Sequence, residues 1–504
     1  MTVRMTSAAA IFALCATTTA VAAPSIDVRV RTDLRRDIDA LLAGPALKGA
    51  EIGLHVVRLP DGVELYSHEA DQLLIPASNI KILTTAAALH YLSPDYRFRT
   101  KVFAEVDGKG IVAGNLYVKG HGDPWLVPER LWFLASRIYF LGVRAVRGNI
   151  IIDDSYFDGS PDANGYEQDS STSSYMAKSS AFSVGFNSLL VHILPASEPG
   201  QPAKILIDPI SRYAKVKGTV TTVARRRSII DVNIEPHNDR SIVKVSGRIS
   251  IKSNGRGYWR RVDNPPVFSG EVLKAMLRQV GIGVKGRVKV GVVPEDAERL
   301  VSLSSPRLAD LVGRVNKHSN NFMAAQIART LGAEVYGAPG TWAKGRRAIE
   351  AFLADEVGIE RGTYMLGNAS GLHDVNRLSP RQVYQILAYV YAQPHIRPEF
   401  VASLAVAGGA GTLSDRMADT DAVSLLRAKT GTLSTASALS GYVTCASGEV
   451  VIFSIIVNGY TVSIHDVWKA QDELGAMLAG LDFAATKNDE TATKAPSADV
   501  AKMP

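Results

Sequence analysis

A serine and a lysine three positions apart open the apolar stretch "PASNIKILTTAAALHYL" (76–92) of this 504-residue chain: Ser78 and Lys81. On a helix, residues i and i+3 share a face, so the lysine nitrogen can reach the hydroxyl. A serine hydroxyl is a weak nucleophile until a neighbouring base takes its proton, and lysine is such a base only when burial or a second cation lowers its pKa. The pair therefore predicts a nucleophilic serine, with an N-capping serine before a surface lysine as the alternative.

Two further motifs carry groups of the same kind. Ser319-Asn320-Asn321 lies at a junction between two helical stretches, and Lys429-Thr430-Gly431-Thr432 lies in a predicted strand. A regular strand would place Lys429 and Gly431 on one face and Thr430 and Thr432 on the other, and the glycine would admit another backbone at close range. Taken singly, the first motif also fits a helix cap and the second a polar edge strand.

In this order, the three motifs resemble those of the penicillin-recognising serine acyl-transferases. Ser319 follows Ser78 by 241 residues, and this long gap resembles the class C low-molecular-mass penicillin-binding proteins, the D-alanyl-D-alanine carboxypeptidase/endopeptidases, rather than the class A β-lactamases. The segments "YVKGHGDPWL" (117–126), "NASGLHDVNRLSP" (368–380) and "AGGAGTLSDRM" (407–417) are similar to further landmarks of that family. The resemblance covers about residues 30–480.

The resemblance implies an α/β transpeptidase-like domain with helices on both sides of an antiparallel sheet, formed by residues 23–96 and 300–484. A β-rich insert of one or two nested subdomains, at 97–299, interrupts it. The residue patterns agree with this organisation. They predict helices at 29–43 and 463–481, strands at 50–58, 62–67, 424–431, 437–446 and 449–458, and, within the insert, one helical piece near 127–142.

The resemblance also implies the role of each site residue. Lys81 would deprotonate Ser78, and the oxyanion would rest on the backbone N–H groups of Ser78 and Thr432. Ser319 and Lys429 would relay a proton to the leaving amine, and Asn321 would donate to an amide carbonyl of the substrate. Lys429, Thr430 and Thr432, beside Gly431, would hold the substrate's carboxylate.

Substrate recognition beyond these motifs is less fixed by the sequence. The loop at 160–170, with Asp162 and Tyr166, is a further candidate for substrate contacts. Asn368 stands where the family landmark usually has an aspartate, and Asp374 lies in the neighbourhood that helps to hold the acidic end of the peptide's diamino acid. An acidic residue there weakens that expectation. Gln326 replaces the usual glutamate after Ser-x-Asn.

Composition restricts the kinds of partner and cofactor that we expect. A formal charge of +7 and 21% charged residues describe a mildly basic globular protein, which suits an anionic polymer or a membrane surface without choosing between them. The basic runs lack interleaved aromatic residues, so we expect no nucleic acid partner. We expect no cofactor and no metal, because His68-Glu69 lacks the second histidine of a zinc helix.

The N-terminus predicts export. Residues 1–22 have the basic residue, apolar run and Ala20-Val21-Ala22 end of a signal peptide, so we expect a periplasmic protein without a transmembrane anchor. Cys445 would then be the single cysteine of the exported chain and could form no internal disulfide. The polar tail at 485–504 is predicted to be disordered.

These features together predict a serine DD-peptidase acting on peptidoglycan stem peptides, as a carboxypeptidase and also as an endopeptidase on cross-links, and acylated by β-lactam antibiotics. A β-lactamase or esterase on the same fold and a non-catalytic wall-binding protein remain the alternatives.

Overall fold

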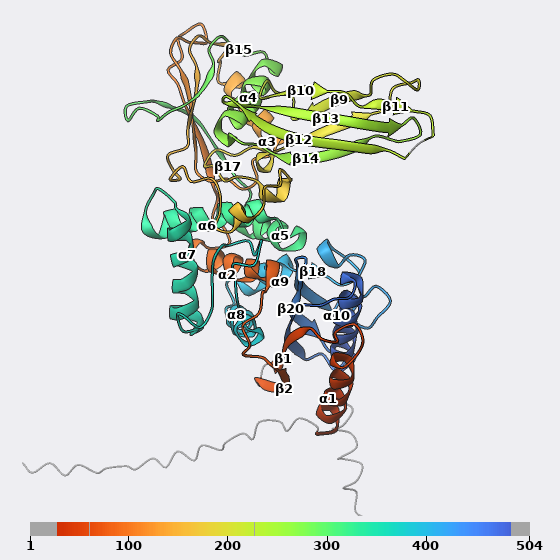
Figure 1. Cartoon of the computed structure of the whole chain (residues 1–504). Coiled ribbons are helices and arrows are strands. Elements are labelled where there is room, and N and C mark those ends of the chain that lie inside the picture. The colour runs from red at the N-terminus through yellow and green to blue at the C-terminus, as the bar shows by residue number, and fades with distance from the viewer. Residues whose placement is uncertain (1–27, 60, 226, 485–504) are drawn as a thin grey trace, which may run out of the picture.

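The computed structural model describes residues 28–59, 61–225 and 227–484. The predicted signal peptide and C-terminal tail lie outside these residues. Figure 1 shows two regions: a sheet with its covering helices at one end, and a β-rich insert at the other.

The first region is built on a six-stranded antiparallel sheet in the order β18-β19-β20-β21-β1-β2. Its strands are β1 (Glu51–Leu59), β2 (Val63–His68), β18 (Ala405–Val406), β19 (Leu426–Thr432), β20 (Ala436–Thr444) and β21 (Val450–Asn458). β1 pairs with β21 along its whole length, which joins the two halves of the chain in one sheet. β20 and β21 are buried almost throughout, as expected for strands covered on both faces.

Helices cover both faces of this sheet, as the resemblance implies. α1 (Val28–Leu42) and α10 (Ile464–Ala479) form one layer, where Leu34, Ile38 and Leu474 share a core with Phe453 and Cys445. The other layer contains α2 (Ile80–Leu92), α5 (Leu308–His318), α6 (Asn321–Tyr336), α7 (Trp342–Ala351), α8 (Pro380–Ala392) and α9 (Arg397–Ser403).

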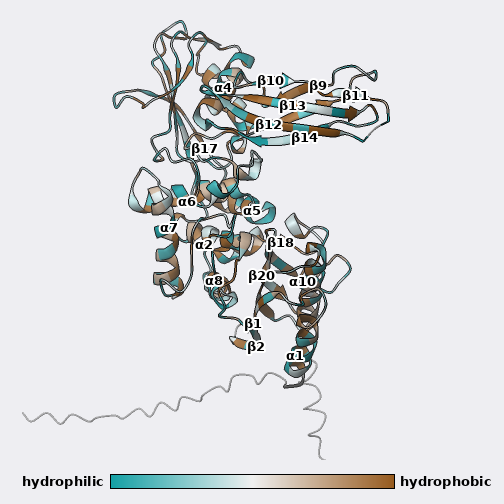
Figure 2. Ribbon diagram, in the orientation of Figure 1, coloured by the Kyte–Doolittle hydropathy of each residue, from teal (hydrophilic) through white to brown (hydrophobic). Residues whose placement is uncertain are grey.

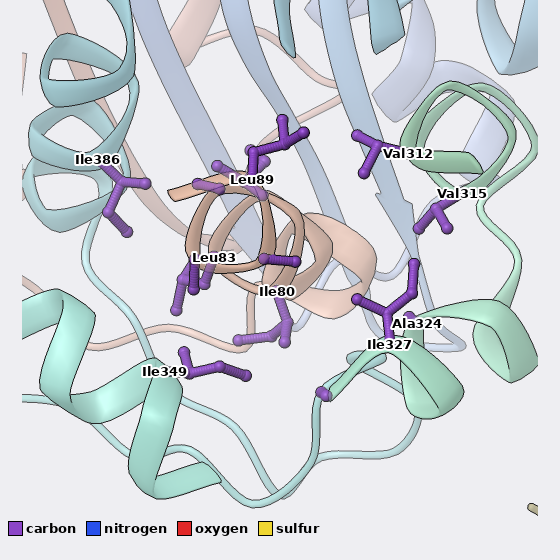
Figure 3. Packing of buried hydrophobic residues seen from close by; sticks show 14 of the residues in the cluster. Ile80, Leu83, Leu89, Val312, Val315, Ala324, Ile327, Ile349 and Ile386 are labelled. Atoms are coloured by element: carbon purple, nitrogen blue, oxygen red, sulfur yellow. The ribbon is translucent and has the colours of Figure 1, made fainter. Parts of the chain in front are cut away.

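α2 is enclosed on every side. Figure 3 shows Ile80, Leu83 and Leu89 of this helix among side chains from the helices around it, including Ile327, Ile349 and Ile386. Every residue from Ile80 to Leu89 is buried, and this includes Lys81. A helix that is apolar all round belongs in a protein interior, so its few polar side chains lie in a low-dielectric environment.

The insert contains four sheets around one shared core. Their orders are β16-β7-β5-β3-β17, β15-β6-β4, β14-β8-β9, and β10-β13-β11 with β12 also paired to β13. The strands are β3 (Arg99–Phe103), β4 (Ile111–Val112), β5 (Leu116–Gly120), β6 (Ala145–Val146), β7 (Ile150–Asp153), β8 (Ser188–Leu194), β9 (Lys204–Asp208), β10 (Ala214–Gly218), β11 (Thr221–Val223), β12 (Ile229–His237), β13 (Arg240–Ser250), β14 (Arg256–Arg261), β15 (Gly283–Val284), β16 (Val288–Val290) and β17 (Arg299–Ser304). Hydrophobic residues of these strands, brown in Figure 2, form a single cluster with residues of α3 (Pro128–Phe140) and α4 (Pro265–Gln279).

Two sequence predictions need correction here. The insert was expected to end at 299, but β17 pairs with β3 and extends the insert's sheet to Ser304. The expectation of one helical piece was wrong: besides α3 (Pro128–Phe140), the insert contains α4 (Pro265–Gln279). Prolines can occupy the first turn of a helix, where the missing N–H is not needed, and the Asn264 side chain caps this one by accepting from the Val267 N–H.

Arg329 of α6 joins the two regions. Its guanidinium, 1% exposed, donates to Asp158 Oδ1 at 2.5 Å and to the Ser160 carbonyl at 3.0 Å, both in the insert. It also lies between the rings of Phe157 and Trp342, with its central carbon 4.2 and 4.8 Å from their centroids. A buried charge with this many partners holds its surroundings in one arrangement.

Replacing this side chain should therefore destabilise the protein. Removing one partner of a buried ion pair typically costs about 3–5 kcal/mol, because the other charge stays buried without compensation. We expect Arg329→Met to lower the free energy of unfolding in urea by about that amount. Arg346→Met, on an arginine half exposed on α7, is the matched control and should change it by less than about 0.5 kcal/mol. Equal effects of the two substitutions would contradict this role of Arg329.

Candidate active site

The three motifs meet at the start of α2. Ser78 lies in a 3-10 turn (Ala77–Asn79) that leads into the helix, Ser319 follows the last residue of α5, and Asn321 is the first residue of α6. Lys429 lies within β19. The structure thus brings together all five residues that the sequence predicts to be catalytic.

Gly431 explains how closely these segments approach. A Cβ atom at this position would lie 2.8 Å from the Pro76 carbonyl oxygen and 3.1 Å from the Ser78 nitrogen. Any side chain would push β19 away from the turn that carries Ser78. The predicted close approach of another backbone is therefore present, and that backbone is the turn that carries Ser78.

Lys81 contacts three oxygen atoms. Its Nζ lies 2.9 Å from Ser78 Oγ and 2.7 Å from Asn321 Oδ1, and it also donates to the Ser370 carbonyl. The last two oxygens can only accept hydrogen bonds, whereas the hydroxyl can also donate. A charged ammonium would donate to all three oxygens, whereas a neutral amine would donate to the two acceptors and turn its lone pair to the Ser78 hydroxyl. The 2.9 Å contact places the amine within reach of the Ser78 proton.

The electrostatic surroundings favour this neutral form. Lys81 and Lys429 are both fully buried, and in the described part of the chain neither forms a salt bridge. Burial, and then the nearby charge of Lys429, lower the pKa of Lys81 well below its usual range. Burial lowers the pKa of Lys429 to about 7.

Lys429 connects the second and third motifs. Its Nζ donates to Ser319 Oγ at 3.0 Å and to the Thr430 carbonyl at 2.6 Å. Ser319 has a φ of 53°, in the left-handed region that non-glycine residues rarely adopt. Such strained backbone persists where the surrounding structure holds it, and here it turns the hydroxyl from the end of α5 towards the lysine.

The open edge of β19 offers hydrogen-bond groups to a ligand. Leu433 donates its N–H to the Ala436 carbonyl, on the side of β20. Because the N–H groups of successive residues in an antiparallel strand point to opposite sides, the N–H of Thr432 points away from β20. There β18 pairs only with Arg427 and Ala428 and leaves that N–H without a strand partner. The Thr430 hydroxyl lies 2.7 Å from that of Thr412, in the segment 407–417.

Two groups of this site were not predicted individually. Thr412 lies in a segment that was noted only as a landmark, and Ser370 contributes a backbone carbonyl, which no side-chain motif reveals. The neighbouring Asn368 organises the Ser370 loop: its Oδ1 accepts from Ser370 N and Gly371 N at 3.1 and 2.9 Å. Its Nδ2 donates to two carbonyls, which the aspartate usual at this landmark could not do.

The two candidate recognition residues are placed differently. Tyr166 is buried, and its hydroxyl lies 3.5 Å from Ser370 Oγ, beside the loop that holds Lys81. Asp162 instead faces Arg261 of the insert at 3.8 Å, and its side chain is 44% exposed. The structure therefore brings Tyr166 next to the site and shows no contact between Asp162 and the catalytic groups.

Other kinds of site find no support in the described residues. Among them no three His, Cys, Asp or Glu side chains are grouped so that they could hold a metal ion. Nor does any helix of the described ranges have the length and apolar character needed to cross a bilayer.

Comparison with known proteins agrees with this geometry. The family model "D-Ala-D-Ala carboxypeptidase 3 (S13)" matches residues 34–481. A D-alanyl-D-alanine carboxypeptidase of Actinomadura sp. (strain R39) is 36% identical over 445 residues, which cover 85% of this chain and 82% of that protein.

The fold has close relatives among solved structures. The crystal structure of penicillin binding protein 4 (dacB) from Haemophilus influenzae aligns with a TM-score of 0.76 at 23% identity, over 91% of this chain and 100% of that one. The same protein complexed with a β-lactam aligns with a TM-score of 0.72 at 22% identity, over 88% of this chain and 100% of that one. The predicted fold class is confirmed. The chain belongs to the D-Ala-D-Ala carboxypeptidase S13 family of serine peptidases.

Proposed function

We propose that this enzyme removes the terminal D-alanine from peptidoglycan stem peptides in the periplasm, with Ser78 as nucleophile and Lys81 as its base. The observation that carries the proposal is the 2.9 Å contact between Ser78 Oγ and a fully buried lysine amine that has no carboxylate partner among the described residues. The periplasmic setting rests on the predicted signal peptide at 1–22.

The reaction would proceed through an ester between the peptide and Ser78. The Ser78 proton passes to Lys81 while Oγ forms a bond to the carbonyl carbon between the two D-alanines. The N–H groups of Ser78 and Thr432 stabilise the resulting oxyanion. As the C–N bond breaks, the leaving amine takes a proton through Ser319 and Lys429. Water then hydrolyses the ester and releases the shortened peptide.

Substrate binding would use the remaining groups of the same cleft. Lys429, Thr430 and Thr432 hold the terminal carboxylate by charge and hydroxyl hydrogen bonds, with Thr412 positioning the Thr430 hydroxyl. Asn321 accepts a hydrogen bond from Lys81 at Oδ1, and its Nδ2 donates to the Tyr175 carbonyl of the insert at 3.4 Å. On that side Nδ2 would donate to an amide carbonyl of the substrate.

Cleavage of a cross-link between two stem peptides needs the same chemistry with a different leaving amine, so we include endopeptidase activity. A β-lactam carries a similar carboxylate and a reactive amide, and would form the same ester.

The nucleophile can be tested by intact mass. We expect the mass of the protein to rise by one drug molecule after exposure to benzylpenicillin, and Ser78→Ala to show no increase because the acylated oxygen is absent. Ser414→Ala, on an exposed serine outside the site, is the control and should be labelled like the wild type. An adduct on the Ser78→Ala protein would refute the assignment. If penicillin is consumed without any adduct, the β-lactamase alternative is favoured. If penicillin is not consumed and no adduct forms, the wall-binding alternative is favoured.

The pH dependence of acylation tests the charge states. A base must be neutral, so the rate should rise with pH as Lys81 loses its proton, well below the usual lysine range. It should fall again as Lys429, whose pKa is lowered to about 7, loses the charge that holds the substrate's carboxylate. Because the charge of Lys429 lowers the pKa of Lys81, Lys429→Met should move the rising limb to higher pH and abolish the falling limb. Single-turnover acylation rates measured across pH would show this, and a rising limb that stays in place would contradict the coupling.

A further inference from the structure

A cavity that is separate from the catalytic groups lies within the insert. It has a volume of about 750 Å³ and is lined by five separate segments, 154–161, 178–180, 236–240, 263–266 and 290–292. Cavities of about 300–1,000 Å³ are the usual size for small-ligand sites. None of the catalytic groups lines it, so the mechanism above does not account for it.

The charges around the cavity are close to balance. Asp158 is neutralised by Arg329, and Arg240 by Glu271 at 2.8 Å. Lys178, Asp154 and Asp263 are the other charged residues of the lining. Burial raises the pKa of Asp154 to about 6, which further reduces the negative charge. This lining gives little attraction to a strongly charged ligand and favours a neutral one.

The lining also combines hydrogen-bonding groups with apolar surface. Asn264 uses its Oδ1 to cap α4, and among the described residues its Nδ2 donates to no other group; Asn238 adds a second amide. Apolar surface comes from four prolines and from two valines at the rim, Val290 and Val292, which are 54% and 66% exposed. N-acetylated sugars present the same mixture: hydroxyl and amide groups together with an apolar ring face and an acetyl methyl group.

One loop connects this cavity to the active site. Ser179 of the cavity wall donates to Gln326 Oε1 at 2.5 Å, and Gln326 lies five residues after the catalytic Asn321 on α6, about 7.5 Å along the helix. Four residues before Ser179, the Tyr175 carbonyl accepts from Asn321 itself. A stem peptide of three or four extended residues spans about 10–14 Å. The residues 175–179 thus lead from a contact with Asn321 to the cavity wall, a length of chain comparable to a stem peptide.

We propose that this cavity binds the N-acetylated disaccharide to which the stem peptide is attached, so that the enzyme holds its substrate at both the glycan and the peptide terminus. The inference rests on the proposed function. It adds a second binding site, which makes the glycan-linked peptide a better substrate than the free peptide.

The test compares two substrates that end in D-Ala-D-Ala: a free pentapeptide and the same pentapeptide on its disaccharide. For the wild type we expect kcat/KM to be about tenfold higher with the disaccharide, the effect of roughly one or two net hydrogen bonds. Val292→Trp, which fills the rim, should bring the ratio close to one. Asn238→Gly, which removes an amide and tolerates the positive φ of that turn, should lower it several-fold. Val216→Trp, on a valine 40% exposed on β10 and outside the cavity, should leave the ratio unchanged.

A wild-type ratio of one, or a preference that survives both cavity substitutions, would overturn the inference. Failure of this inference differs from failure of the proposed function. If the proposed function is wrong, neither substrate is hydrolysed and no penicillin adduct forms. Titration of the peptide-free disaccharide into the Ser78→Ala protein gives an independent reading. Saturable binding that Val292→Trp weakens would support the inference, and absence of binding at millimolar sugar would contradict it.

Discussion

The site depends on an unusual electrostatic arrangement: the amines of Lys81 and Lys429 are both fully buried, and among the described residues neither forms a salt bridge. An isolated ammonium is costly to bury, and a second one nearby increases the cost. The protein can relieve this cost by letting one lysine lose its proton, which converts Lys81 into a base. In this account the reactivity of Ser78 originates in the burial of Lys81 and in its repulsion by Lys429.

Much of the fold serves to maintain this arrangement. α2 is enclosed by helices of one layer, which keeps the Lys81 side chain fully buried. Gly431 allows β19 to lie against the turn that carries Ser78, and Gly371, with a φ of 75°, allows the Ser370 loop to approach Ala77 from the other side. The position of the base is therefore fixed by three segments that are far apart in the sequence. Arg329 and Gln326 then tie α6, and with it Asn321, to the insert.

The sequence was informative where a local pattern has a single structural solution. The apolar stretch around Lys81 indicated a helix on which this lysine could meet Ser78, and the three motifs predicted which side chains would lie together. It was uninformative where partners are backbone atoms or distant segments. The Ser370 carbonyl has no signature of its own, the pairing of β17 with β3 joins strands almost 200 residues apart, and the Pro265-Pro266 pair at the start of α4 reads as a helix breaker. The cavity in the insert likewise has walls from five segments that no sequence window contains.

The charge of Lys81 can be observed directly. With lysine residues labelled at the ε-carbon, NMR spectra recorded across pH report the protonation of each amine, and Lys81→Met identifies the resonance of interest. The account predicts that this lysine titrates well below 10.5, its ordinary value, and is largely neutral at the pH where acylation is fastest. A Lys81 resonance that stays in the charged position up to about pH 10 would contradict it, because the base proposed for Ser78 would then not exist in the working enzyme.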